Sequence, residues 1–431
     1  MKKKPTVRMI KYAAQVVSLA MTIVAFTFNA SADVISDWNA MTFGHAAAVG
    51  RPGGSVTIDL ATVHAAQYDA VQAIERDYEP YRVTDVPNAA GSPIAAAVKA
   101  ARDVLLARFP TRAAIIQGQY DTYLINNGID PNDPGIAVGT YVAARLIAYR
   151  SCDDSLPAPR PESYVGGTAM GQWRPTPGVT AMKPGEWQGN ITPFFMTRPS
   201  QFRSDPPPPM ESNQYARDHD EVRLYGAATG SLREQYHNDL AAFWTSPGRE
   251  VFVALRTVAT ANVDNVSDSS RLFALASMAA ADATIGVWND KFYYSFWRPY
   301  TAIREEDNNP RTTRNPTWTP LVNTPPYPDH SSGANGSSGS VFQAMMNFFD
   351  TDNMAFSITH SVSGVTRNYT SFSQAMQEMV DVRVYQGIHF RFADVAGRKL
   401  GQNVAKWGHK NYLRPRKGSD EIAARVSAAS R

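Results

Sequence analysis

The sequence KFYYSFWRPYTAIR, residues Lys291 to Arg304, combines two basic side chains with a run of aromatic residues. Lys291 and Arg298 are seven residues apart, which is close to two turns of an α-helix. This spacing predicts that both side chains project from one face of a helix that Pro299 ends. The aromatic residues around them indicate a buried face, where two cations repel each other unless an anion lies between them. The stretch therefore indicates either an anion site or, less readily, a solvated basic face.

The sequence PPYPDHSSGANGSSG, Pro325 to Gly339, joins a proline-rich run to the start of a predicted helix. Ser332 precedes this helix, and Gly333 lets a ligand approach the backbone because it has no Cβ. Free N–H groups at a helix start, together with a serine hydroxyl, suit the oxygens of an oxyanion. Taken alone, the segment is more typical of an ordinary helix N-cap than of an anion site.

The sequence RVYQGIHF places Arg383 six residues before His389 in a mostly apolar segment. This composition predicts a buried Arg/His pair. A lone histidine in such a segment is more often a hydrogen-bonded core residue than a nucleophile.

Together these three segments resemble the vanadium-dependent haloperoxidase and type 2 phosphatidic acid phosphatase superfamily, in the order Lys-x6-Arg-Pro, Ser-Gly and Arg-x5-His. The flanking sequences AAADATIGVWND, WTPLVNTPPYPDHSSG and HFRFADVAGRKLG are similar to its bacterial secreted haloperoxidase-like branch. The likeness extends over nearly the whole chain after residue 32.

The resemblance implies a helical protein that encloses one oxyanion. The implied cofactor-binding and catalytic residues are Lys291, Arg298, Ser332, Gly333, Arg383 and His389. With vanadate, His389 would be the metal ligand, and the metal would act as a Lewis acid on peroxide for attack by halide. With a phosphate ester, His389 would be the nucleophile and would form a phosphohistidine.

The sequence departs from the family pattern at two positions. Ala334 stands where the acid–base histidine is usual, and loss of a positioned general acid typically costs about 10²–10⁴-fold in rate. Ala393 stands where a carboxylate usually follows the site histidine, and Asp394 is a candidate to orient His389 in its place. We include His330 among the catalytic candidates because it could replace the missing acid; the alternative is that His330 only packs at the rim of the pocket.

From the resemblance we predict an exported, vanadate-dependent haloperoxidase-like enzyme that oxidises halide with hydrogen peroxide. The alternatives are an acid phosphatase that works through His389 and a degenerate oxyanion-binding protein without turnover. The expected cofactor is vanadate, or phosphate as substrate in the phosphatase, and the expected partners are small molecules. The sequence leaves the oligomeric state open.

Helical periodicity runs through nearly the whole chain, as in VTIDLATVHAAQYDAVQAIE and SPIAAAVKAARDVLLARF, so we expect an all-α fold. We predict one helical domain over residues 33–413, with an active-site core at 285–400. Residues 151–212 are rich in Pro, Gly and Trp and are expected to form a long irregular insertion. Residues 414–431 are expected to form a loose tail.

Residues 1–32 are predicted to form a secretory signal peptide. They have a basic start, an apolar stretch and the small residues of ASA before Asp33. An uncleaved membrane anchor is the alternative. Cleavage would leave no stable membrane anchor and would place the protein in the periplasm or outside the cell. It would also remove five basic side chains and no acidic ones, which changes the formal net charge from +3 to −2. This charge does not favour nucleic-acid binding.

Overall fold

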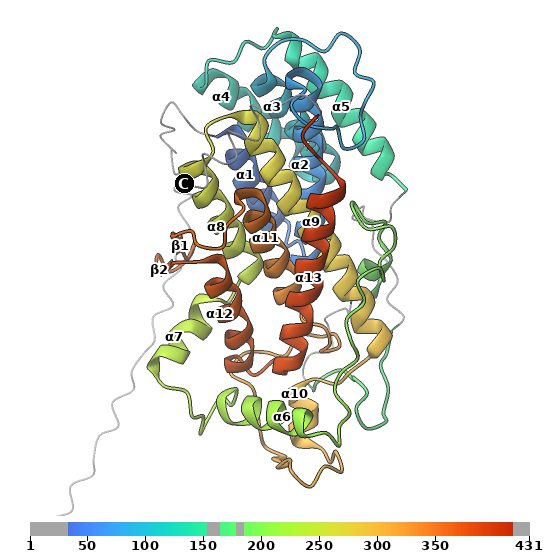
Figure 1. Ribbon diagram of the computed structural model, residues 1–431, viewed down its shortest axis with the longest axis vertical. Coiled ribbons are helices and arrows are strands. Elements are labelled where there is room, and N and C mark those ends of the chain that lie inside the picture. Colours follow the sequence, from blue (N-terminus) through green and yellow to red (C-terminus); the bar gives the residue numbers. More distant parts are fainter. Residues whose placement is uncertain (1–32, 153–163, 178–184, 417–431) are drawn as a thin grey trace, which may run out of the picture. The chain divides into compact units, whose positions relative to one another are not determined.

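The computed structural model describes residues 33–152, 164–177 and 185–416, and these pack as one compact unit (Figure 1). The predicted signal peptide lies outside the described residues. The all-α prediction is confirmed, with one short hairpin in addition. The first five helices are α1 (Val34–Ala48), α2 (Gly53–Glu75), α3 (Pro93–Arg108), α4 (Ala113–Asn126) and α5 (Pro134–Arg150). The later helices are α6 (Asn213–Tyr225), α7 (Gln235–Phe243), α8 (Pro247–Asn262), α9 (Val266–Tyr294), α10 (Pro299–Arg304), α11 (Gly333–Phe349), α12 (Phe372–Tyr385) and α13 (Arg391–Asn411).

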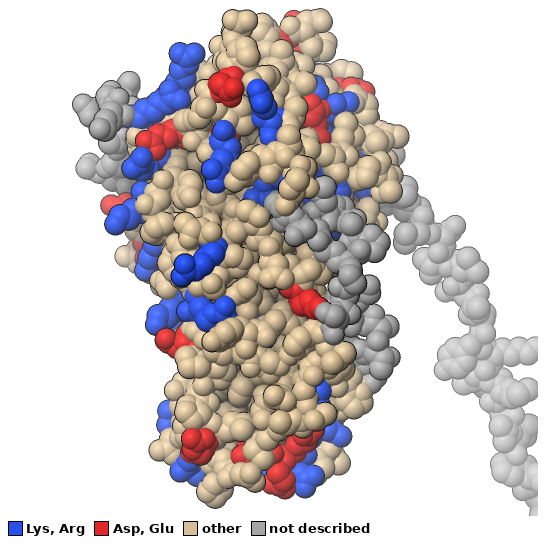
Figure 2. Space-filling view, turned by 90° about the vertical axis from the view of Figure 1, so that its right-hand side faces the viewer, with Lys and Arg blue, Asp and Glu red and all other residues tan. Residues whose placement is uncertain are grey.

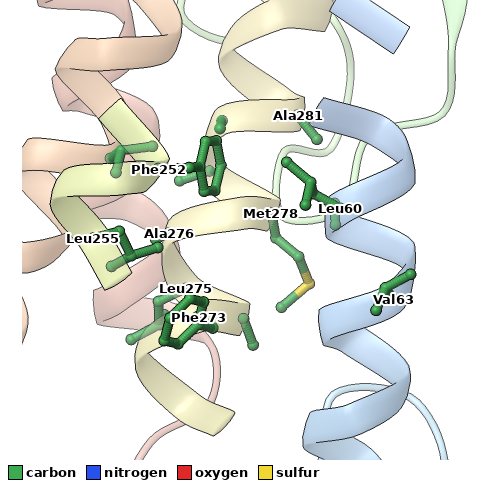
Figure 3. Close-up of a cluster of buried hydrophobic side chains, with 14 of the residues drawn as sticks. Leu60, Val63, Phe252, Leu255, Phe273, Leu275, Ala276, Met278 and Ala281 are labelled. Atoms are coloured by element: carbon green, nitrogen blue, oxygen red, sulfur yellow. The ribbon is translucent and has the colours of Figure 1, made fainter. Parts of the chain in front are cut away.

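The long helix α9 forms the centre of the core and packs against α2, α11 and α13. Its side chains meet those of α2 and α8 in an aliphatic and aromatic cluster that includes Leu60, Val63, Phe252, Leu255, Phe273 and Met278 (Figure 3). Among the described helices, only α9 is long and apolar enough to cross a membrane, but 94% of its apolar window is buried inside the protein. Its apolar character is therefore explained by its place in the core.

The hairpin pairs β1 (Phe356–Thr359) with β2 (Thr366–Tyr369) in antiparallel register. The buried Glu378 of α12 fixes it by accepting hydrogen bonds from Arg367, at 2.8 and 2.9 Å, and from the Tyr369 hydroxyl, at 2.7 Å. These strands are not evident from the sequence, because each is only four residues long.

The described parts of the Pro-rich insertion are irregular apart from a short 3₁₀ helix, Glu186–Asn190, which packs against α9. Buried Asp282 of α9 accepts the backbone N–H groups of Phe194, Phe195 and Met196 at 2.6–2.7 Å. Asp290, two turns further along α9, accepts the N–H of Ser204 at 3.1 Å. Carboxylates of one core helix therefore anchor a segment that has no regular structure of its own.

The predicted boundary of the loose tail at residue 414 is too early. Arg414 pairs with Glu79 at 2.9 Å, and the Arg416 N–H donates to the carbonyl of Asp77 at 3.0 Å. Residues 417–431 lie outside the described residues.

Basic and acidic side chains are interspersed on the face of the molecule in Figure 2, with wide areas of other residues between them. No basic stripe runs across this face.

Helices α11 and α13 approach so closely that their backbones touch. A Cβ at Gly397 would clash with the carbonyl oxygen of Ser332, and a Cβ at Gly401 would clash with that of Gly336. This contact brings the start of α11, which carries Ser332, against the first turns of α13.

We expect Gly401→Ala to destabilise the fold by about 1–3 kcal/mol, because the added methyl group forces two packed backbones apart. Gly118→Ala is the matched control: this glycine is exposed in α4 with open space around it, so alanine should stabilise the protein by about 0.5–1 kcal/mol. Urea unfolding of both variants measures the difference. Equal stabilities for the two variants would show that the α11–α13 contact is not tight.

Candidate active site

Four of the candidate site residues converge from separate elements on one buried place. Lys291 lies in the last turn of α9, and Arg298 directly precedes α10. Arg383 lies in the last turn of α12, and His389 lies in the turn between α12 and α13. Lys291, Arg298 and His389 are buried, and Arg383 is half-buried. We call these four residues the cage.

Lys291 and Arg298 do not share a helical face, so the prediction from their spacing is wrong. Helix α9 ends at Tyr294 because Ser295 adopts a left-handed conformation, with φ of 50°. Pro299 is the first residue of α10 and does not end a helix that contains Arg298. Proline suits a first helical position because its ring fixes φ and it has no N–H to satisfy. The two cations therefore reach the cage from different helices.

The loop before α11 supplies carbonyl groups to both cations. Lys291 Nζ donates to the carbonyls of Pro328 and Asp329, both at 2.9 Å. Arg298 Nε donates to the carbonyl of Tyr327 at 2.8 Å, and its Nη1 donates to that of Ile388 at 2.6 Å. These bonds hold the cage and the loop in one arrangement.

Arg298 and Arg383 each have a fully buried guanidinium nitrogen without a protein partner among the described residues. These groups are Nη2 of Arg298 and Nε of Arg383. A buried donor without a partner is costly, commonly by about 1–3 kcal/mol. An acceptor bound in the cage would remove this cost.

Ser332 is the N-cap residue of α11, but its hydroxyl makes no capping bond to the helix. Its backbone N–H donates to the carbonyl of Ala393 at 2.9 Å, and Asn335 Nδ2 lies 3.4 Å from its Oγ. The Ser332 side chain also hydrogen-bonds to the buried carboxylate of Asp394, so a neighbouring residue holds its hydroxyl when no ligand is bound. Gly333 follows at the start of the helix, where a Cβ would lie 3.0 Å from the ring of Trp288. Close packing against Trp288 is thus one reason why position 333 is a glycine. The other, predicted from the sequence, is that a ligand can approach the backbone there.

His389 pairs with a carboxylate that the sequence analysis did not identify. Its Nδ1 lies 2.8 Å from Asp329 Oδ1. Asp394, the candidate for this role, instead accepts a hydrogen bond from Asn335 Nδ2 at 2.9 Å. The hypothesis that Asp394 orients His389 is therefore wrong. Asp329 directly precedes His330 in the proline-rich loop, and no local spacing connects it with a histidine sixty residues away.

Burial shifts the charge states of the cage residues. Burial lowers the pKa of Lys291 well below its usual value, and the charge of Arg298 lowers it further. Burial also lowers the pKa of His389 well below its usual value, with smaller contributions from Arg298 and Lys291. Burial raises the pKa of Asp329 to about 7, against the opposing charges of Arg298 and Lys291. His389 is consequently neutral, and a bound anion would favour the charged forms of the surrounding cations.

A cavity of about 460 Å³ lies beside the cage. Gly333, Ala334 and Ser337 of α11 line it together with Arg383, Trp288 and Tyr327. The opposite side comes from the α1–α2 connection and from the start of α8, including Arg51 and Arg249. The lining contains three arginines and no carboxylate, so it favours anions, and Ala334 leaves room where a larger side chain would stand.

Residues 271–418 match the family model described as the VCPO second helical-bundle domain, and this range contains the entire cage. A vanadium chloroperoxidase of Curvularia inaequalis is 24% identical over 284 residues, which cover 49% of this chain and 46% of that protein. The chain resembles the vanadium-dependent haloperoxidases. The match spans just under half of the length of this curated relative.

Solved structures of bacterial vanadium haloperoxidases share the fold. The structure described as the first bacterial vanadium-dependent iodoperoxidase superposes with a TM-score of 0.77 at 22% identity, covering 90% of this chain and 99% of that chain. An apo-type bacterial vanadium-dependent chloroperoxidase gives a TM-score of 0.66 at 16% identity, covering 86% and 94%. The predicted resemblance to vanadium haloperoxidases is thus confirmed for the fold and for the family of the C-terminal helical bundle.

His330 faces away from the cavity that contains Ala334. Its Nε2 lies 2.9 Å from the carbonyl oxygen of Asp205 and 3.1 Å from Ser204 Oγ. Its side chain lines a separate cavity of about 700 Å³, between the 201–208 segment and α13. This placement contradicts the hypothesis that His330 turns inward to replace the missing acid. The loop turns the imidazole outward because the Pro-rich insertion supplies its hydrogen-bond partners.

We expect His330 to make the protein sensitive to acid. Burial lowers its pKa to about 4, whereas an unfolded histidine titrates near 6.5. The unfolded state therefore binds more protons as the pH falls through this window, and stability decreases. Between pH 7 and pH 5, wild type should lose about 2 kcal/mol more unfolding free energy than His330→Gln. Urea unfolding at pH 7 and pH 5 measures this difference in free energy. Measurements at pH 8 serve as the reference, because residue 330 carries no added proton there in either protein. Parallel losses in the two proteins would contradict the assignment.

Proposed function

We propose that this protein is a vanadate-dependent haloperoxidase-like enzyme that oxidises halide with hydrogen peroxide. The observation that carries the proposal is the convergence of Lys291, Arg298 and Arg383 around a neutral, buried histidine. The three cations come from three elements, and Arg298 and Arg383 lie close enough to lower the pKa of Lys291. An anion between the three would stabilise their charged forms. The relatives described above are vanadium-dependent by name, which supports vanadate as that anion.

The residues of the cage fit a tetrahedral oxyanion. The unpartnered N–H groups of Arg298 and Arg383 can donate to its oxygens. The Ser332 hydroxyl can donate as well if it turns from Asp394 to the ligand. Gly333 is the first residue of α11, and its backbone N–H is a further hydrogen-bond donor. His389 Nε2 would bind the central atom, because Nδ1 faces Asp329. When bound, vanadate supplies Lewis-acid activation of peroxide.

Each cage residue has a separate part in this function. The three cations neutralise the oxyanion and hold it in a site from which bulk water is largely excluded. His389 stays neutral and presents a lone pair, while Ser332 and Gly333 orient the oxygens. The arginine-lined cavity admits the halide and the molecule to be oxidised or halogenated.

Phosphate-ester hydrolysis is the second candidate, because a phosphoryl group has the same tetrahedral shape and charge. His389 would attack phosphorus through Nε2. Ala334 favours only esters with good leaving groups in this case, because it offers no proton to the departing oxygen. A protein that binds the oxyanion without turnover is the remaining outcome.

We further propose that the protein is exported and works in the periplasm or outside the cell. This proposal rests on the signal-like residues 1–32 alone.

The function is tested on purified protein with and without orthovanadate. We expect bromination of a phenolic reporter dye that needs vanadate and peroxide together, and His389→Ala should reduce it to background. His330→Gln is the control, because His330 lines the other cavity and should leave the rate within about threefold of wild type. Hydrolysis of an activated aryl phosphate, inhibited by vanadate, would instead identify the phosphatase. Thermal stabilisation by orthovanadate without either activity would identify the binding protein, and full activity in His389→Ala would refute the site.

Ala334→His restores an imidazole in the cavity beside the cage. We expect the rate to rise by about 10²-fold or more, because a positioned acid–base group is added. Ala334→Gln is the matched control, since glutamine is of similar size but cannot transfer a proton in this way. The same rate in both variants, with both folded, would show that position 334 does not limit catalysis.

A further inference from the structure

Asp329 is the carboxylate that meets the imidazole of the site histidine. Its Oδ1 lies 2.8 Å from His389 Nδ1, and both side chains are buried, with 0% and 2% of their surfaces exposed. No other carboxylate in the described part of the chain lies within ion-pair distance of His389. Asp394 is directed to Asn335.

The cage itself holds Asp329 in place. Its N–H donates to the carbonyl of Phe296 at 2.9 Å, and its own carbonyl accepts from Lys291 Nζ at 2.9 Å. Arg298 Nη1 lies 3.5 Å from Oδ1. The backbone N–H, the backbone carbonyl and the side chain of Asp329 are thus all held by neighbours. The side chain therefore presents Oδ1 to His389 in a defined direction.

The carboxylate beside the imidazole favours one tautomer. When ionised, Asp329 can only accept a hydrogen bond, so it favours a hydrogen on Nδ1. Arg298 Nη1 lies at nearly equal distances from the two ring nitrogens, 3.1 Å from Nε2 and 3.3 Å from Nδ1. Asp329 is therefore the contact that distinguishes the two nitrogens.

We propose that Asp329 is the positioning residue of the site: it holds His389 in the Nδ1–H tautomer and so presents the Nε2 lone pair to the central atom of the oxyanion. The inference rests on the proposed function in that Nε2 is taken as the reacting or ligating atom. A carboxylate behind a histidine commonly fixes its ring and tautomer, in metal sites as in catalytic ones. Here it comes from the loop before α11 and not from the helix that follows the histidine.

The direct test is the tautomer of His389 in the intact protein labelled with ¹⁵N-histidine, measured by long-range ¹H–¹⁵N NMR. The His389 signals are identified by their loss in His389→Gln. We expect wild type to carry the hydrogen on Nδ1, and Asp329→Asn to change the tautomer population. Asp290→Asn is the matched control: this buried carboxylate contacts Ser204 and Ser331 but not His389, so the His389 signals should keep the wild-type pattern.

Calorimetric titration gives the second readout. Orthovanadate and inorganic phosphate should bind Asp329→Asn about 10- to 100-fold more weakly than wild type. An Nε2–H tautomer in wild type overturns the proposal, even if Asp329→Asn does not fold. Unchanged His389 signals with unchanged oxyanion affinity in folded Asp329→Asn overturn it as well. If the tautomer changes as expected but neither halide oxidation nor ester hydrolysis is found, the proposed function fails and the positioning role of Asp329 stands.

Discussion

The burial of Lys291 and Arg298 against the carbonyl groups of the loop before α11 is the constraint on which the site depends. Two cations in a low-dielectric interior are unfavourable unless oxygens surround them. Residues 327–329 supply three such oxygens, and the turn before His389 supplies a fourth. The first three of these bonds also fix the loop that leads into Ser332. The cage and its approach loop are consequently one structure.

The helices around the cage make this arrangement possible. Helix α9 carries Lys291 at its end and anchors the Pro-rich insertion through Asp282 and Asp290. The glycine contact between α11 and α13 brings Ser332 next to the turn that contains His389. Packing of the core therefore decides the distances within the site, although few core residues touch it.

Two departures from the family pattern have different structural outcomes. The missing carboxylate after His389 is replaced, because Asp329 occupies the Nδ1 side of the imidazole. The missing histidine at position 334 is not replaced by His330, which is bonded to Ser204 and Asp205 on the other side of the loop. The Nδ1 side of His389 thus still faces a carboxylate, while Ala334 has no side chain that could transfer a proton. This combination favours chemistry that needs a bound oxyanion and a neutral histidine more than it needs a general acid.

The sequence by itself determined the helical class and the identities of the cage residues, because helical periodicity and short motifs are local properties. Only the tertiary structure decided how these residues meet. The spacing of Lys291 and Arg298 suggested that both lie on one helix. Ser295, between them, adopts a left-handed backbone conformation that ends α9 before α10 begins. The partner of His389 lies sixty residues earlier in the chain, and the direction of His330 depends on an insertion more than a hundred residues away. Such contacts are set by packing of distant segments, which no local pattern encodes.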